Sequence, residues 1–331
     1  MTKSRRKWHA ETKACANIAL AKYWGKADIP LNLPAVPSIS MTLDGLVTET
    51  RIRVDETLDA DRVELDGREA TASESKRVIA LLDDIRRRAK RREFAHVVSR
   101  NRFPTAAGLA SSASGFAALA SAADHAYELG ASDRVLSAIA RQASASAARS
   151  IYGGFVELPA GKPGQKSLAA KPLFDADHWD LRIVVAQTAK GPKKVGSTEG
   201  MERSRETSPF YDAWVAKAPA ITKRIRQALR KRDLDTLGAA MEQSTMAFHA
   251  CAMTAEPSIF YWQPATLAAV HAVRQLRDEK GLSVWCTMDA GPHVKTLCHA
   301  DDARKVRAAL KKTEGVLSTL VAKPGPGVQT R

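Results

Sequence analysis

The stretch that decides the fold is FPTAAGLASSASG, which runs from Phe103 to Gly115 and precedes an apolar, alanine-rich run. Pro104 disfavours a helix before it, and Gly108 permits a backbone turn that a Cβ would resist. The small side chains that follow leave backbone N–H groups uncovered at the start of a predicted helix. Unpaired donors and the positive end of the helix dipole favour an anion such as phosphate. The stretch therefore predicts a phosphate-binding loop, with tight packing of small residues as the alternative.

The order of residues in this loop is distinctive. It matches neither the P-loop pattern GxxxxGK[ST] nor the dinucleotide pattern GxGxxG. Instead, proline and small residues lead to Gly-Leu, and the pair Ser111 and Ser112 opens the helix. This order favours phosphate binding over simple packing.

Length and composition fit a soluble globular enzyme. The chain has 331 residues, of which 44% are hydrophobic and 26% charged, and this length suits two domains or one large one. No apolar run approaches the ~18–20 residues that span a bilayer, and the basic N-terminus lacks the apolar stretch of a secretory signal. We expect reduced thiols, a cytoplasmic location and no membrane partner. The cysteines, which show no zinc or redox spacing, are Cys15, Cys251, Cys286 and Cys298.

A net charge of +15 raises the question of a polyanionic partner. The basic run RRRAKRR, residues 86–92, would be its landing site, and nucleic acid would bind mainly through its phosphates. Against this, the run lies on a helix predicted at 73–92 and lacks interleaved aromatic residues for base stacking. We expect a solvated helix face and no nucleic-acid partner. Phosphorylated small substrates account for part of the charge.

The pattern of apolar residues predicts a mixed order of strands and helices. Because strands and helices do not alternate strictly, the predicted class is α+β and not a doubly wound sheet. We place the domain boundary before the apolar strand at 181, which gives domains 1–180 and 181–331. Strands are predicted at 15–20, 38–43, 48–54, 96–100, 152–157, 181–187, 284–288 and 293–297. Helices are predicted at 73–92, 111–129, 132–148, 209–230, 233–250, 262–280 and 301–311.

Two motifs in the first half carry polar side chains that suit a ligand site. NIALAKYWGK, residues 17–26, ends a predicted strand with lysines and aromatic residues, and AVPSISMTL follows at 35–43. ASASAARS, residues 143–150, places Ser146 and Arg149 on one face of a helix end. The planar fork of an arginine among small side chains suits a carboxylate. The alternative is an arginine that binds the last carbonyls of its own helix.

A third motif lies in the second half. MDAGP, residues 288–292, places Asp289 at the end of a predicted strand and before a Gly-Pro turn. An acidic residue there is positioned to face a cleft, although an isolated DAGP is more often a simple turn. KKVGSTEGM, residues 193–201, adds a further polar segment.

Together these motifs resemble the GHMP kinase superfamily and, in the spelling PTAAGLASSASG, its mevalonate diphosphate decarboxylase branch. The matching motifs span residues 14–327. The resemblance implies a GHMP-kinase-type two-domain fold with a ferredoxin-like C-terminal domain and a cleft between the domains. It also implies ATP as co-substrate, Mg²⁺ and a homodimer. The implied reaction is ATP-dependent decarboxylation of mevalonate 5-diphosphate to isopentenyl diphosphate, a step of isoprenoid biosynthesis in the mevalonate pathway.

The resemblance implies roles for individual residues. Asp289 would orient and deprotonate the C3 hydroxyl, Arg149 would hold the departing carboxylate, and Lys22 would lie near the reacting hydroxyl. No metal-ligating residues are implied. The implied ATP-binding residues are Ala107, Gly108, Leu109, Ala110, Ser111 and Ser112. The implied substrate-binding residues are Tyr23, Trp24, Gly25, Lys26, Arg77, Ser144, Ser146, Arg149, Ser197 and Thr198.

Three positions depart from the family pattern. Ala143 and Ala145 stand where glycine is usual, so two methyl groups bear on how closely the backbone approaches a ligand. His293 stands where asparagine is usual, and we expect no catalytic role for it.

Three other functions remain open from the sequence. A decarboxylase of the monophosphate would give isopentenyl phosphate, and a mevalonate 3-kinase of the same fold would stop after phosphoryl transfer. A basic protein that binds RNA or an anionic surface would show salt-sensitive binding and no ATP turnover.

Overall fold

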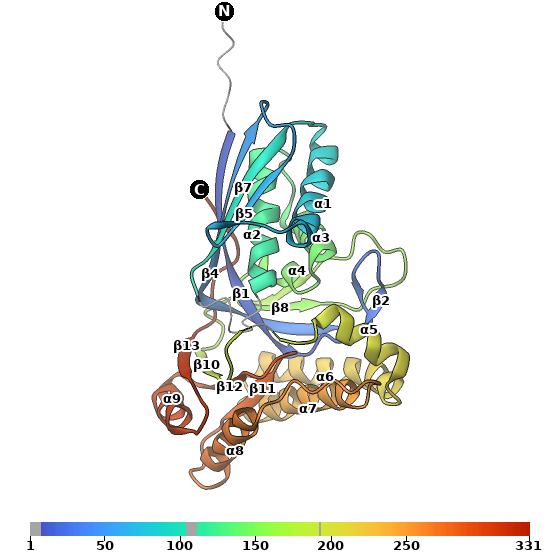
Figure 1. Cartoon of the computed structure of the whole chain (residues 1–331). Coiled ribbons are helices and arrows are strands. Elements are labelled where there is room, and N and C mark those ends of the chain that lie inside the picture. The colour runs from blue at the N-terminus through green and yellow to red at the C-terminus, as the bar shows by residue number, and fades with distance from the viewer. Residues whose placement is uncertain (1–7, 104–110, 192) are drawn as a thin grey trace, which may run out of the picture.

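The computed structural model describes residues 8–103, 111–191 and 193–331, which form two main β-sheets with helices packed against them (Figure 1). The larger sheet has eight strands in the order β14-β1-β4-β7-β5-β6, with β8 and β9 continuing from β4. Its strands are β1 (Trp8–Ala21), β4 (Ser38–Asp55), β5 (Arg62–Leu65), β6 (Arg68–Glu69), β7 (Phe94–Asn101), β8 (Phe155–Leu158), β9 (Lys171–Phe174) and β14 (Gln329–Thr330). A small hairpin of β2 (Lys26–Asp28) and β3 (Leu33–Pro34) stands beside it.

Four of the described helices pack on the larger sheet or on one another beside it. They are α1 (Ala72–Ala89), α2 (Ser111–Ala126), α3 (Asp133–Ala143) and α4 (Ala147–Ser150). The helix α2 lies directly on β1 and β4, and α1 and α3 pack on α2. Alanines make this close approach feasible because their side chains are short, and twelve of the sixteen residues of α2 are buried.

The second sheet is antiparallel, in the order β11-β12-β10-β13. Its strands are β10 (Leu181–Gln187), β11 (Trp285–Met288), β12 (Val294–His299) and β13 (Ser318–Ala322). The helices of this half are α5 (Ser197–Thr207), α6 (Tyr211–Lys231), α7 (Leu234–Met253), α8 (Pro264–Asp278) and α9 (Ala303–Lys312). The mixture of helices and sheets confirms the predicted α+β class, while the domain boundary at 180–181 stays a prediction.

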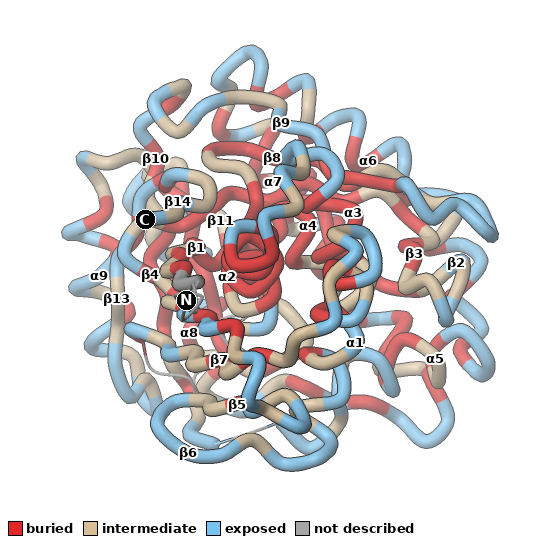
Figure 2. Tube along the Cα trace, turned by 90° about the horizontal axis from the view of Figure 1, so that it is seen from above, coloured by how far each residue is buried: buried red, intermediate tan, exposed pale blue. Residues whose placement is uncertain are grey.

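One hydrophobic core joins the two sheets. Apolar residues of β1 and β4 pack in the same cluster as those of β10, α6 and α7. A second cluster fills the space between the other face of the small sheet and the helices α8 and α9. In Figure 2 the buried positions gather in the middle of the molecule, around α2 and α7, and the exposed positions form the periphery.

The segments predicted as separate strands at 38–43 and 48–54 form one continuous strand, β4. The interruption between them is a bulge: Cys15 pairs with Val47, but Asn17 pairs with Thr42. Gly45, which has φ +81°, lies within this irregularity. The prediction of two strands was wrong because a bulge and a strand end look alike in sequence.

The helix predicted at 132–148 is broken. The helix α3 ends at Ala143, Ser144 is extended with φ −155° and ψ 119°, and α4 begins after Ser146. Serine side chains compete with helical backbone hydrogen bonds, which explains the break within ASASAARS. The chain consequently turns before Arg149.

The basic run is balanced by acidic residues. Arg86 forms ion pairs with Asp61 and Asp83, and both Arg87 and Arg88 pair with Asp84. Because these arginines are already paired, the run is a poor match to the strip of free positive charge that a polyanion requires. No helix of the described residues is long and apolar enough to cross a membrane.

Candidate active site

Asp289 lies between two buried lysines at the inner end of β11. The Nζ of Lys22, just beyond β1, is 2.6 Å from Oδ1 of Asp289, and the Nζ of Lys295 on β12 is 3.1 Å from Oδ2. The lysine side chains are 3% and 1% exposed, whereas the Asp289 side chain is 29% exposed. The carboxylate is thus the member of this trio that reaches open space.

The two lysines decide the ionisation of Asp289. Burial alone would raise the pKa of its carboxyl group, but the charges and hydrogen bonds of Lys22 and Lys295 hold that pKa well below its usual range. Burial lowers the pKa of Lys22 to about 8, against the opposing effect of Asp289. At neutral pH the carboxylate is therefore ionised and Lys22 is predominantly protonated.

Arg149 is buried without a carboxylate partner among the described residues. Its Nη1 donates to Ser38 Oγ at 2.7 Å, its Nε donates to Ser40 Oγ at 3.0 Å, and its Nη2 donates to Asn17 Oδ1 at 3.3 Å. Its side chain is 2% exposed, and burial lowers its pKa to about 10, so it stays charged at neutral pH. A buried cation held by neutral acceptors can accept an anionic ligand.

Lys22 and Lys295 contact the carboxylate of Asp289, and the charge of Arg149 interacts with it without a direct contact. We call these four residues the Asp289 cluster. Its formal charge is positive, which is costly to bury unless an anion completes it. Lys193 adds a further cation: its Nζ contacts Ser197 Oγ at 2.5 Å and the carbonyl oxygen of Ala290 at 3.1 Å. The arrangement suits a substrate with several negative charges.

The segment from Tyr23 to Lys26 leads away from the cluster. The Tyr23 hydroxyl is buried and lacks a hydrogen-bond partner among the described residues. Trp24, also predicted as substrate-binding, is 2% exposed in an aromatic cluster, and its Nε1 donates to Ser204 Oγ at 3.0 Å. Its indole therefore packs in the core and holds the loop in place.

Gly25 and Lys26 complete this segment. Gly25 has φ +107°, and a Cβ there would lie 2.3 Å from the hydroxyl oxygen of Tyr211, so only glycine fits. Burial lowers the pKa of Lys26 against the opposing charge of Glu202, and the charge of Arg77 adds to the lowering. Arg77 lines a cavity of about 180 Å³ with Pro30, in the turn between β2 and β3. Lys26 and Arg77 are thus electrostatic neighbours although they lie far apart in sequence.

The remaining predicted serines and threonine lie at helix ends. Ser144 follows α3 and Ser146 precedes α4, where its carbonyl oxygen accepts from Asn17 Nδ2 at 3.1 Å. Ser197 and Thr198 begin α5, and Ser111 and Ser112 begin α2. The other predicted ATP-binding residues lie outside the described residues: Ala107, Gly108, Leu109 and Ala110.

The three departures from the family pattern have simple structural accounts. Neither Ala143 nor Ala145 has a positive φ, so the backbone there does not demand glycine. Ala145 packs in a buried apolar cluster. His293 accepts a hydrogen bond at Nδ1 from the backbone N–H of Thr188 at 3.1 Å, and burial lowers its pKa to about 4. It therefore connects the turn after Asp289 to the end of β10 as a neutral side chain.

The sequence analysis did not identify several residues of the site. Lys295, Ser38 and Ser40 are the main ones, and each had a weak signal. Lys295 is the charged residue in the otherwise uncharged strand VKTLCH, and the serines alternate along SISMT. Ser244 of α7 accepts from the backbone N–H of Lys22 at 2.9 Å, which no local pattern could indicate.

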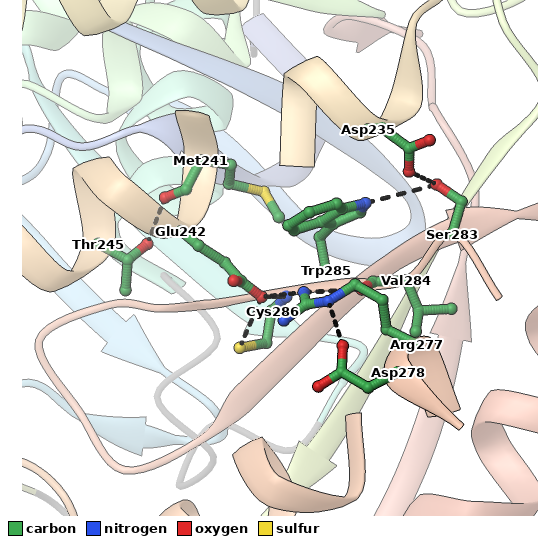
Figure 3. A network of polar contacts seen from close by, with 10 residues as sticks. All are labelled: Asp235, Met241, Glu242, Thr245, Arg277, Asp278, Ser283, Val284, Trp285 and Cys286. Atoms are coloured by element: carbon green, nitrogen blue, oxygen red, sulfur yellow. Dashed lines mark hydrogen bonds and ion pairs between the residues drawn. The ribbon is translucent and has the colours of Figure 1, made fainter. Parts of the chain in front are cut away.

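A network of polar contacts links β11 to α7, and Figure 3 shows part of it. Oε1 of Glu242 accepts from the backbone N–H of Cys286 at 2.9 Å and from Nη1 of Arg277 at 3.1 Å. On the same helix, Thr245 Oγ1 lies 2.8 Å from Thr287 Oγ1. These contacts fix the strand that ends one residue before Asp289.

The site fits a metal that arrives with a nucleotide better than a resident metal. Within the described residues, no group of three or more His, Cys, Asp or Glu side chains could hold a metal ion. The hydroxyls of Ser111 and Ser112 stand at the N-terminus of α2, where a nucleotide phosphate would bind. Magnesium commonly takes most of its ligands from phosphates and water.

Two family models match the chain. The model described as diphosphomevalonate decarboxylase-like N-terminal domain matches residues 14–169, and that described as mevalonate 5-diphosphate decarboxylase C-terminal domain matches residues 183–321. A diphosphomevalonate decarboxylase of Ganoderma lucidum is 37% identical over 309 residues, or 86% of this chain and 77% of the relative. The human diphosphomevalonate decarboxylase is 35% identical over 317 residues, or 90% and 78% of the two chains.

Solved structures agree with these relatives. Mevalonate diphosphate decarboxylase from Staphylococcus aureus superposes with a TM-score of 0.93 at 33% identity, covering 98% of each chain. The structure of MDDEF in complex with MVAPP, AMPPCP and magnesium superposes with a TM-score of 0.91 at 36% identity, covering 98% of this chain and 99% of that one. The GHMP-type fold implied by the sequence is thereby confirmed.

Proposed function

The chain belongs to the diphosphomevalonate decarboxylase family, and from that premise we propose how the Asp289 cluster carries the reaction. The enzyme catalyses ATP-dependent decarboxylation of mevalonate 5-diphosphate, which yields isopentenyl diphosphate, phosphate, carbon dioxide and ADP. ATP is the co-substrate, and Mg²⁺ accompanies it. The observation that supports the roles below is that two buried lysines hold both oxygens of one carboxylate, with the buried guanidinium of Arg149 as a further cation held by neutral groups.

The chemistry explains why ATP is required. A β-hydroxy acid has a poor leaving group, so the γ-phosphoryl group is first transferred to the C3 oxygen. Magnesium on the nucleotide spreads the charge of that transfer. Departure of phosphate then leaves positive character at C3, and cleavage of the C1–C2 bond supplies the electron pair as carbon dioxide leaves. The protein therefore needs to position groups and balance charge, without supplying a nucleophile.

In this scheme Asp289 orients the C3 hydroxyl and takes its proton. Because Lys22 and Lys295 hold the pKa of Asp289 low, the carboxylate is a weak base in the free enzyme. It accepts the proton only once the C3 oxygen has begun to bond to phosphorus and the hydroxyl has become acidic. Until then its hydrogen bond to the hydroxyl aligns the oxygen for attack.

Arg149 holds the carboxylate that leaves as carbon dioxide. A guanidinium has five N–H donors, and the bonds to Ser38, Ser40 and Asn17 use three of them. The others are available for a bidentate contact with a carboxylate.

The 5-diphosphate end is assigned to the segment that leads away from the cluster. Lys26 and Arg77 supply positive charge there, and the Tyr23 hydroxyl supplies a donor. Ser197 and Thr198, at the N-terminus of α5, supply hydroxyl and backbone donors. The phosphates of ATP are assigned to the start of α2, at Ser111 and Ser112.

Two properties of the whole chain belong to the same proposal. The enzyme is a homodimer, which the family resemblance supports. Light scattering of the purified protein would measure the mass of the particle in solution and so test this state. It works in the cytoplasm, which is supported by its free and buried cysteines, Cys15, Cys251, Cys286 and Cys298.

One assay tests the proposed substrate. Wild-type enzyme with ATP and Mg²⁺ is offered mevalonate, its 5-phosphate or its 5-diphosphate, and ADP and carbon dioxide are measured together. The 5-diphosphate should give the highest kcat/KM and equal amounts of both products. A higher kcat/KM for the monophosphate, or ADP without carbon dioxide, would contradict the proposal.

A further inference from the structure

Lys295 is a lysine in a place that normally carries an apolar side chain. It lies on β12 opposite Val185 of β10 and Thr287 of β11, and its side chain is 1% exposed. Leu297, two residues on and on the same face, belongs to the core that joins the two sheets. Burying a charged lysine in such a core costs free energy unless the lysine is paired with an opposite charge. Its ion-pair partner within the described residues is Asp289.

The pairing uses both oxygens of one carboxylate. Lys22 contacts Oδ1 and Lys295 contacts Oδ2, so the two cations approach Asp289 from different strands. A carboxylate held by one oxygen can rotate about its Cβ–Cγ bond, whereas one held by both cannot. Both oxygens are then held in a fixed direction, in a side chain that is 29% exposed.

We infer that Lys295 is a positioning residue of the decarboxylation: it fixes Asp289 through Oδ2, so that Oδ1, shared with Lys22, faces the C3 hydroxyl. This inference rests on the proposed role of Asp289. Lys22 follows the end of β1 and is 3% exposed, whereas Lys295 lies within β12, between β10 and β11, and is 1% exposed. Lys295 therefore acts on the reaction through Asp289 and does not bind substrate.

The charged and titratable groups around Asp289 come from every element packed against it. Lys193 approaches from the segment before α5, Arg149 from α4, His249 from α7 and His293 from the turn before β12. Burial lowers the pKa of His249 to about 3 and that of His293 to about 4, so both are neutral and cannot replace a lysine. Loss of the Lys295 charge must therefore raise the pKa of Asp289.

The test is the pH dependence of kcat for Lys295→Met, a variant of similar length without the charge. We expect kcat to fall at least tenfold at neutral pH, with KM for mevalonate 5-diphosphate within about threefold of wild type. The acid limb of the kcat profile should move upward by about 1–3 pH units, because the carboxylate is protonated at higher pH. Thr296→Val, on the opposite face of β12, should leave the profile unchanged, since its buried hydroxyl has no hydrogen-bond partner in the part of the chain that the structure describes.

Two further variants separate charge from packing. Lys295→Arg keeps the charge, so its acid limb should coincide with that of wild type even if kcat falls. Lys295→Gln keeps a hydrogen-bond donor without the charge, and its acid limb should move upward, which tests the inference even if Lys295→Met does not fold. Neutral variants with the wild-type acid limb, or an arginine variant with the same upward shift, would overturn the inference. Absence of ADP and carbon dioxide from wild type would instead overturn the proposed function.

Discussion

At the scale of single residues, Asp289 carries the most specific role. Asp289→Asn removes the proton acceptor but keeps the size of the side chain, so ATP and substrate should still bind within several-fold of wild type. Because the hydroxyl then has no base, kcat should fall by about 10²–10⁴. Steady-state kinetics with mevalonate 5-diphosphate measure both quantities. The matched control is Asp301→Asn, which changes an exposed carboxylate outside the Asp289 cluster. This variant should keep wild-type kcat.

Lys22 gives a prediction about alkaline pH. Burial lowers its pKa to about 8 against the opposing effect of Asp289, and the charges of Lys295 and Arg149 contribute to this lowering. As the pH rises through 8, Lys22 loses the charge that holds Asp289 and attracts an anionic substrate. The value of kcat/KM, which reports the free enzyme, should therefore fall about tenfold per pH unit above that point.

The control for this effect is Lys22→Arg, whose guanidinium stays charged throughout. Its normalised kcat/KM profile should lose the limb near pH 8, whatever its absolute rate. A wild-type kcat/KM that stays constant up to pH 10 would show that the charge of Lys22 is not needed.

The residues of the site were unequally predictable from sequence. Asp289 and Arg149 stand in short motifs whose chemistry is local, so a strand end and a helix end were enough to identify them as candidates. Lys295 was missed because its role depends on the pairing of β11 with β12. Trp24 is the opposite of Lys295, because it stands in a recognisable motif. Its indole packs against Phe248 and Tyr261 in the core.

At the scale of secondary-structure elements, the contact between α7 and β11 sets the position of the site. A Cβ on Gly238 of α7 would lie 1.8 Å from Cγ of Trp285, which stacks on Arg277. Helix propensity alone predicts that Gly238→Ala stabilises the protein by about 1 kcal/mol. Overpacking reverses the sign, so we expect a loss of about 1–3 kcal/mol in the free energy of unfolding, measured by urea denaturation.

The neighbouring position supplies the comparison. Ala239→Gly, on the same turn of α7, should cost about 1 kcal/mol through helix propensity alone. Stabilisation by Gly238→Ala would mean that Trp285 moves freely and that α7 does not fix β11.

The elements themselves were predicted well where apolar periodicity is uninterrupted. The strand predicted at 181–187 is β10. The helix predicted at 233–250 starts one residue before α7 (Leu234–Met253). Two errors fall at β4, where a bulge resembles a strand end, and at α3, where serines end a helix early. Both irregularities lie beside the site, since β4 carries Ser38 and Ser40 and the break after α3 precedes Arg149. The short strands β2, β3, β5, β6, β9 and β14 and the helix α5 were not predicted.

At the scale of the whole molecule, function depends on contacts between distant parts of the chain. Lys22 and Asp289, from the beginning and the end of the sequence, meet where the two sheets share a core, and Arg149 from the middle contacts Asn17 of β1. Local patterns cannot supply such contacts, so the fold and the implied reaction came from the family resemblance. The residues then explained why this arrangement suits a substrate with a carboxylate at one end and phosphates at the other.

The most direct test of this account measures ADP and carbon dioxide in one reaction with mevalonate 5-diphosphate, for wild type and for Arg149→Lys. Wild type should release the two products in equal amounts. Lysine keeps the charge but loses the planar fork that matches a carboxylate, so carbon dioxide release should fall about 10²-fold while ATP still binds. ADP formation by wild type without carbon dioxide, or a fully active Arg149→Lys, would contradict the account.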